Sequence, residues 1–358
     1  MRKLSEIKQE MLQQIIINTV VESGTGGGSI EHYNRSNNWS IVDKTTIKTP
    51  NRITTNINGN QYNIANDISI DINTETYWDD NQYSVPLNRK GKDFYIYHTN
   101  DNQIVLSANS TFPNDFTSEN TRKIGGFHCL CEDVGTITNH TLSDYITGDI
   151  LPQSIWDIIH KPIANPEGMV YNPNINRWID IYLAGINDNK LVSKYDIPHV
   201  TGETTEKFHW YKFSHWFGLV GKRMLNQHEF QNSSLGSNQG TNITGSVNPI
   251  TTGGYVDTAG RRMISNIGCE SMCGVLWQWG EQKGTGTGAA WTNAFDGNDS
   301  LDVRGQHYLA PNVPLFGGRW SNGTYCGSRS SYWNHSPLHL GASNGSRGSS
   351  EPMVRGHD

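Results

Sequence analysis

The chain has 358 residues, of which 35% are hydrophobic, 17% charged and 10% aromatic, including 11 tryptophans and 15 tyrosines. A formal charge of −6, with lysine and arginine scattered along the chain, excludes the basic footprint of a nucleic-acid-binding protein. The longest apolar stretch, residues 15–21, is far shorter than the roughly 20 residues of a membrane span, so no membrane insertion is expected.

Residues 3–21 are predicted to form a helix, because Leu4, Ile7, Met11 and Ile15 recur at three- and four-residue steps. A glycine-rich break follows, and a lone helix of this kind is marginal in water. We therefore expect residues 1–25 to serve attachment and trimerisation, the alternative being that the helix packs on the next domain of its own chain. The stretch has no small-residue cleavage site, so it is not a secretory signal.

Residues 26–147 are predicted to be a β-rich stalk, a small prism or barrel followed by a sandwich. Ile68, Ile70 and Ile72 alternate onto one face of a strand, and residues 94–107 form two strands around a polar Asn/Asp turn. This region supplies most of the expected β structure.

Residues 148–358 form the last predicted domain, which mixes strands with helices. A short helix is expected around residues 155–159 and an amphipathic helix over 213–220, where apolar residues recur at i, i+3, i+4 and i+7. Strands are expected over 178–184 and 275–279. The predicted fold class is therefore mainly β with some α, an α+β protein.

The final 70 residues or so are predicted to be mostly loop with embedded aromatic residues. Residues 316–350 contain few aliphatic side chains but two tryptophans, Trp320 and Trp333, among Gly, Ser, Asn, His, Tyr and Arg. Disordered linkers lack tryptophan, and its large apolar ring needs a partner surface. The composition therefore indicates an ordered and functional segment.

Several blocks in this half of the chain resemble the C-type-lectin-like fold shared by formylglycine-generating enzymes and the variable proteins of diversity-generating retroelements. These blocks are VGKRMLNQHEF, GSNQGTNITGS, TTGGYVDTAGRRMISNIGCESMCGVLWQW, and the FGGRW and GSRG that enclose the last segment. Together with GDILPQSIWDIIHKP and EGMV…WIDIYL, they are most similar to phage receptor-binding proteins of the major-tropism-determinant family. The resemblance covers most of residues 148–348, whereas the earlier residues match only in kind.

The resemblance implies a receptor-binding surface made of variable side chains. In that family a retroelement mutates adenines of AAC or AAT codons, which yields many residue types but never Trp, Lys, Gln, Glu or Met. Trp320 and Trp333, which such mutation cannot produce, fall in framework slots that anchor the segment from beneath. The positions that fall in the variable slots all carry reachable types: Arg319, Ser321, Asn322, Gly323, Tyr325, Tyr332, Asn334, His335, His339, Gly341, Ser343 and Asn344.

The cysteines and the acidic residues bear on two other kinds of site. Formylglycine-generating enzymes use two closely spaced cysteines after their GG motif, where this chain has only Cys326, so an enzyme is not expected. The odd count of five cysteines indicates reduced, mostly buried thiols. Calcium-dependent lectin motifs are incomplete here, so no cofactor is expected. An open alternative is a structural cation near Asp296, Asn298, Asp299 and Asp302.

The resemblance implies a phage tail-fibre-tip adhesin that recognises a bacterial surface receptor, either a protein or a glycan. A homotrimer is expected, joined to other tail-fibre components through its N-terminal region, made in the host cytoplasm and carried on the virion. The alternative is a retroelement-diversified bacterial surface protein of the same fold, against which the lack of a lipoprotein or secretory signal counts.

Overall fold

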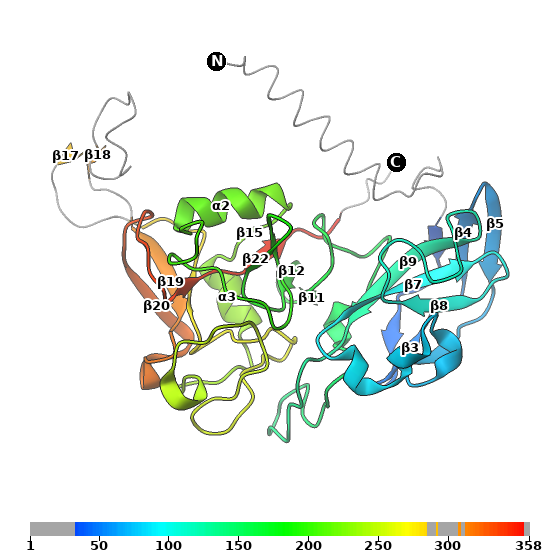
Figure 1. Cartoon of the computed structure of the whole chain (residues 1–358), viewed down its shortest axis with the longest axis horizontal. Helices are drawn as coiled ribbons and strands as arrows, with labels where there is room; N and C mark the ends of the chain where they lie inside the picture. The colour runs from blue at the N-terminus through cyan, green and yellow to red at the C-terminus, as the bar shows by residue number, and fades with distance from the viewer. Residues whose placement is uncertain (1–32, 285–290, 293–306, 309–311, 354–358) are drawn as a thin grey trace, which may run out of the picture. The chain divides into compact units, whose positions relative to one another are not determined.

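The computed structural model describes residues 33–284, 291–292, 307–308 and 312–353 (Figure 1). The chain divides into two compact units, of which the first runs to Val85 and includes Phe94–Gly126, and the second holds Pro86–Asp93 and everything from Phe127 onward. The predicted N-terminal helix and the predicted cation site lie outside the described residues, and the predicted domain limits at residues 25 and 147 stay predictions.

Short strands make up the first unit. They pair in the orders β1-β4-β5 and β2-β3-β6, and in a third group β7 lies between β8 and β9. The elements are β1 (Tyr33–Arg35), β2 (Ser40–Ile41), β3 (Thr46–Lys48), β4 (Ile53–Ile57), β5 (Asn60–Ile64), β6 (Ser69–Asp71), η2 (Glu75–Tyr77), η3 (Asn81–Ser84), β7 (Asp93–Thr99), β8 (Ile104–Ser107) and β9 (Thr121–His128).

The period-two pattern predicted for this unit is confirmed. Ile70 and Ile72 are fully buried and Ile68 is half-buried, as expected for one face of a strand. The predicted hairpin is the antiparallel pair β7 and β8, in which Ile96 lies opposite Leu106. The polar residues between the two strands supply its turn.

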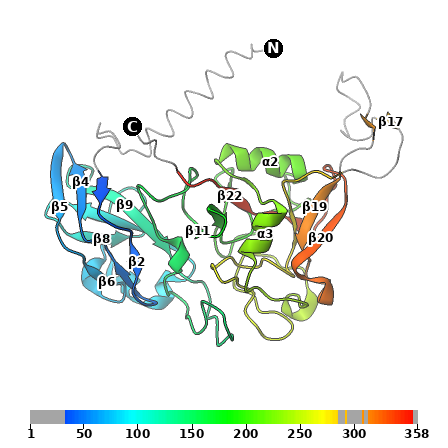
Figure 2. The same ribbon diagram turned by 180° about the vertical axis from the view of Figure 1, so that it is seen from behind.

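In its described residues, the second unit combines two four-stranded sheets with two helices, α2 and α3 (Figure 2). The strand orders are β11-β12-β22-β15 and β20-β19-β16-β21, and β13 pairs with β14. The elements are η4 (Pro86–Arg89), η5 (Pro152–Ser154), β10 (Trp156–Asp157), β11 (Met169–Asn172), β12 (Arg177–Asp180), β13 (Gly185–Asn187), β14 (Lys190–Val192), α2 (Trp210–Leu219), β15 (Arg223–Met224), α3 (Gln227–Ser233), η6 (Thr244–Ser246), β16 (Trp277–Trp279), β17 (Trp291–Thr292), β18 (His307–Tyr308), β19 (Val313–Gly317), η7 (Gly323–Tyr325), β20 (Gly327–His335), β21 (Asn344–Gly345) and β22 (Gly348–Ser350).

One of the two helices predicted in this unit is confirmed and the other is wrong. Helix α2 buries Phe213 and Phe217, the apolar face that the spacing indicated. No helix forms at residues 155–159, where a 3-10 turn leads into strand β10. The carboxylate of Asp157 accepts hydrogen bonds from the backbone N–H of Ile159 at 2.8 Å and of His160 at 2.6 Å. A side chain that takes these donors offers the backbone an alternative to a helix.

Arg347 is buried within the second unit and is 1% exposed. Its guanidinium donates from Nε to the Gln278 Oε1 atom at 3.0 Å and from Nη1 to the carbonyls of Asp180 and Ile181, both at 2.7 Å. Its Nη2 donates to the carbonyl of Glu270. One side chain from the closing GSRG motif therefore connects the end of strand β12, strand β16 and the segment that leads into β16.

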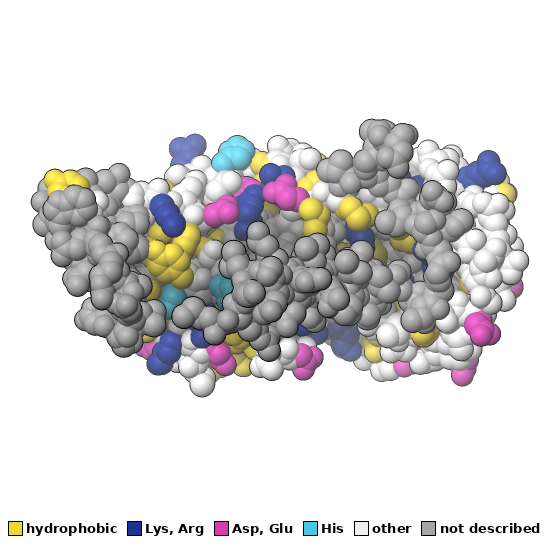
Figure 3. Space-filling view, turned by 90° about the horizontal axis from the view of Figure 1, so that it is seen from above, with side chains coloured by type: hydrophobic (Ala, Val, Ile, Leu, Met, Phe, Trp, Pro, Cys, Tyr) yellow, Lys and Arg dark blue, Asp and Glu magenta, His cyan; other side chains and the backbone are white. Residues whose placement is uncertain are grey.

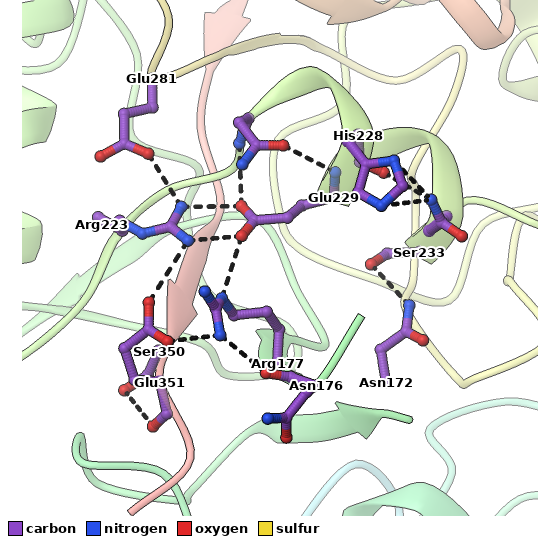
Figure 4. A network of polar contacts seen from close by, with 12 residues as sticks. Asn172, Asn176, Arg177, Arg223, His228, Glu229, Ser233, Glu281, Ser350 and Glu351 are labelled. Carbon is purple, nitrogen blue, oxygen red and sulfur yellow. Dashed lines mark hydrogen bonds and ion pairs between the residues drawn. The ribbon is translucent and has the colours of Figure 1, made fainter. Parts of the chain in front are cut away.

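A second polar network surrounds Glu229 at the start of helix α3 (Figure 4). The side chains of Asn226 and Glu229 form a capping box, each accepting from the other's backbone N–H. Arg223 donates to both oxygens of Glu229, and Arg177 donates to Oε1 at 3.2 Å. Burial opposes ionisation of Glu229, but hydrogen bonds and charge from Arg223 lower the pKa of its carboxyl overall. The VGKRMLNQHEF block therefore supplies the hydrogen bonds and the ion pair that stabilise the start of helix α3.

Among the described side chains visible on the face seen from above, basic and acidic groups lie interspersed among uncharged ones (Figure 3). This distribution agrees with the scattered charges of the sequence. In the part of the chain that the structure describes, no helix is long and apolar enough to cross a membrane.

Candidate functional site

The C-terminal segment is a β-hairpin, so the prediction of a mostly loop structure is wrong for this part. All five residues of β19 are buried, and β20, nine residues long, runs antiparallel to it with an irregular register and stays mostly exposed. Gly, Ser and Asn have low strand propensity, which hid the strand in the sequence. Pairing with a fully buried neighbour overrides that propensity and displays the side chains of β20 on a rigid support.

Most of the predicted variable positions lie at the surface on this hairpin and the turns beside it. The exposed side chains are those of Ser321, Tyr325, Tyr332 and Asn334. The half-buried positions are Arg319, Asn322, Gly323, His335, His339 and Gly341. Tyr325 is 77% exposed and Tyr332 41%, so both rings are available to a partner.

Ser343 and Asn344 do not share this surface, and their predicted receptor-facing role needs correction. They are 8% and 2% exposed. The reason is strand β21, which pairs in parallel with β16 so that Asn344 lies opposite Trp277, whose N–H donates to the Ser343 carbonyl at 2.9 Å. This pairing draws both residues into the framework, where the Ser343 hydroxyl accepts a hydrogen bond from Arg319 at 3.2 Å.

The two framework tryptophans differ in how they are held. Trp320 is half-buried against a core cluster that includes Met263 and Val275, and its backbone N–H donates to the Val275 carbonyl at 3.0 Å. Trp333 is 37% exposed, with its ring edge-on to Phe316 at a centroid distance of 6.5 Å. Trp320 therefore fits the predicted anchor from beneath, whereas Trp333 presents much of its ring to solvent.

Residues 236–246 support the displayed turn, a role that the sequence did not assign to them. The side-chain oxygen of Asn242 accepts from the Gly323 N–H at 3.0 Å, and its amide nitrogen donates to the Trp320 carbonyl. The N–H of Gly240 donates to the Cys326 carbonyl at 2.8 Å. The GSNQGTNITGS block carried the family resemblance, but an Asn that bonds two backbone groups far along the chain leaves no local pattern to find.

An aromatic row crosses the same hairpin. The Tyr332 ring lies 6.1 Å from Trp277 and 5.0 Å from His335, and His335 stacks on His339 at 3.8 Å with an interplanar angle of 13°. Burial, helped by the neighbouring His339, lowers the pKa of His335 to about 4. Burial also lowers the pKa of His339. At neutral pH this row is therefore uncharged, suited to apolar and hydrogen-bonding contacts.

The paired glycines of the GG-x-W motif allow the chain to turn between β19 and η7. Gly317 and Gly318 have φ values of 89° and 84°, in the left-handed region. A Cβ on Gly317 would lie 2.5 Å from the carbonyl oxygen of Met272, which is backbone and cannot rotate away.

Replacing Gly317 with alanine is expected to lower the free energy of unfolding by about 3 kcal/mol, since it adds both strain and a clash. Gly218 in helix α2 is a matched control, because a Cβ there meets nothing within 4 Å. Chemical denaturation of the two variants checks this, with Gly218→Ala expected to be neutral or slightly stabilising. Equal effects would show that the GG turn relaxes without cost.

The five cysteines are free and buried, as predicted. Burial raises the pKa of Cys326 and of Cys269 to about 11, and it raises that of Cys273 still further. Thiols with raised pKa values are weak nucleophiles and poor metal ligands at neutral pH. Nothing in these groups favours the enzyme alternative.

Comparisons with known proteins identify the family to which this chain belongs. Residues 42–157 match the family described as the Mtd second domain. The tail fiber receptor-binding protein of Bordetella phage BPP-1 is 30% identical over 294 residues, which cover 77% of this chain and 75% of that protein. The chain belongs to the Mtd family of tail-fibre receptor-binding proteins.

Solved structures of the Mtd family agree with this assignment. The Major Tropism Determinant I1 variant superposes with a TM-score of 0.74 at 27% identity, and the U1 variant with 0.73 at 26%. Each match covers 90% of this chain and 86% of the solved chain. The predicted family and the mainly β class are thereby confirmed. Since Mtd relatives are named for receptor binding and tropism, the chain is not an enzyme.

Proposed function

We propose that this chain is a phage adhesin that binds a bacterial surface receptor through the hairpin β19–β20, η7 and the turn after β20. The supporting observation is that exposed Tyr325 and Tyr332 are displayed among small polar side chains on a backbone pinned by Asn242. Tyrosine with Ser, Gly and Asn is the composition of antibody paratopes, because it combines wide contact area with few rotors.

The second unit is taken as the C-type-lectin-like recognition domain, and the N-terminal region as the attachment to other tail-fibre components. A homotrimer at the fibre tip of the virion, made in the host cytoplasm, would sum weak single contacts into avidity. Retroelement diversification would act on the surface positions, with Ser343 and Asn344 as supports. The receptor is a protein or a glycan on the host.

The adsorption of the purified full chain to a panel of bacterial strains tests this function. We expect saturable binding to a subset of strains, displaced by excess unlabelled chain. Binding to none of the strains, or equal and unsaturable binding to all, would contradict it. The second candidate, a diversified bacterial surface protein, is distinguished by flanking DNA, where the adhesin requires phage tail genes. A reverse transcriptase gene with a near-copy of the coding segment for residues 316–348 would establish diversification.

A further inference from the structure

Strand β20 carries a three-residue bulge that lies outside the predicted variable positions. Phe316 pairs with Ser331, yet the next residue, Gly317, pairs with Gly327. Residues 328–330 therefore project from the ladder without a partner on β19, and Arg329 at their centre is exposed. Bulges of this kind re-aim side chains and recur beside functional sites.

The bulge is held in place by the same segment that holds the turn at η7. The Gln239 Oε1 atom accepts from the backbone N–H of Ser328 at 3.1 Å and from its hydroxyl at 3.3 Å. Its neighbour Gly240 donates to the Cys326 carbonyl, and Asn242 bonds Gly323. Arg329 is thus presented from a fixed backbone next to the proposed receptor surface.

The surroundings leave the charge of Arg329 available. Residues 312–350 contain no Asp or Glu and three arginines. Of these, Arg347 is buried, and Arg319 donates only to the hydroxyls of Ser321 and Ser343, both at 3.2 Å. Among the described residues, the guanidinium of Arg329 makes neither a hydrogen bond nor an ion pair. A surface strip with cations and no anions favours a partner that brings its own carboxylates.

We propose that Arg329 is a fixed anion-recognition contact and that the receptor is a protein whose surface presents carboxylates to it. This inference rests on the proposed function and deepens it. A guanidinium binds a carboxylate through two parallel hydrogen bonds, which fixes orientation as well as affinity. The six residues of β20 outside the bulge extend over roughly 20 Å at the usual rise per residue, a large part of the width of a standard protein–protein interface. That extent favours a protein partner over a single sugar chain.

A different role for Arg329 would be to guard an edge. In the described part of the sheet β20 lies at one end of the strand order, and charges with bulges protect such edges from pairing with another chain. The two roles differ in what a substitution changes. An edge guard affects self-association, whereas a recognition contact affects adsorption and its dependence on salt.

The test compares the full chain with Arg329→Glu, Arg329→Lys and Arg329→Ala on a strain to which the wild type adsorbs. Arg329→Glu is expected to weaken adsorption at least tenfold, and Arg329→Lys to weaken it less. Added NaCl is expected to weaken adsorption of the wild type more than that of the Arg329→Ala variant. Arg52→Glu is the matched control, an exposed arginine of the first unit, and is expected to adsorb like wild type. Protease treatment of the cells should abolish binding, and periodate oxidation of glycans should spare it.

The outcomes separate this inference from the proposed function. Wild-type adsorption with an unaffected Arg329→Glu variant overturns the recognition contact alone. The same result with increased light scattering by Arg329→Ala assigns the residue to edge protection. Binding that survives protease but not periodate overturns the protein receptor. If the wild type adsorbs to no strain, both the proposed function and the inference that rests on it are contradicted.

Discussion

Replacing Arg347 with methionine is expected to lower the free energy of unfolding of the second unit by about 4 kcal/mol. Methionine fills much of the volume but donates nothing. In the wild type the guanidinium donates to the side-chain oxygen of Gln278 and to the carbonyls of Asp180, Ile181 and Glu270. The change therefore leaves these four buried acceptors without that donor. Each unsatisfied buried acceptor costs about 1–3 kcal/mol, with partial relief as neighbours relax.

The measurement is calorimetric unfolding of the full chain, where a loss of this size moves the transition by roughly 8–16 °C for a unit of this length. Arg329→Met is the matched control, because it removes the same group from an exposed position and is expected to change stability by no more than about 0.5 kcal/mol. A loss below about 1 kcal/mol for Arg347→Met would mean that water reaches the four acceptors, and that the guanidinium does not hold the sheets together.

The sequence predicts those parts of this fold in which local pattern and burial agree. Helix α2 follows the spacing of Phe213 and Phe217, and the buried Ile70 of β6 and Ile72 directly after it follow the predicted alternation. The helix predicted at residues 155–159 does not form because Asp157 competes for the backbone donors, a contact that the apolar spacing does not reveal. Where a polar side chain accepts hydrogen bonds from the backbone, the spacing of apolar residues alone predicts the wrong secondary structure.

The candidate surface was predictable only as far as the family resemblance extends. The resemblance locates Tyr325 and Tyr332, which are exposed. It does not separate them from Asn344, because a Ser- and Asn-rich stretch has the same composition on a surface as in the buried strand β21. The bulge around Arg329 depends on the register between β19 and β20, and the support from Gln239 is a contact across 89 residues of sequence. Both arise from tertiary structure, so no local pattern encodes them.

Replacing both Tyr325 and Tyr332 with alanine is expected to weaken adsorption to a susceptible strain about 100-fold. Truncation of one central tyrosine at an interface costs about 1–2 kcal/mol or more, so two give roughly two orders of magnitude. Tyr325 is 77% exposed, and its loss leaves the fold nearly unchanged. Tyr332 also packs on Trp277, so its removal should cost stability by no more than about 1 kcal/mol.

The assay titrates the full chain onto cells and follows unfolding of each variant in parallel, so that lost binding is not mistaken for lost folding. Tyr62→Ala serves as the control, a half-buried tyrosine on strand β5 of the first unit, and should adsorb like wild type. Phenylalanine at positions 325 and 332 separates ring contact from hydroxyl bonding: retained adsorption assigns the energy to ring area, and lost adsorption assigns it to the hydroxyls. Undiminished adsorption of the double alanine variant would remove β20 and η7 from the receptor surface, whereas an equal loss with Tyr62→Ala would place binding on both units.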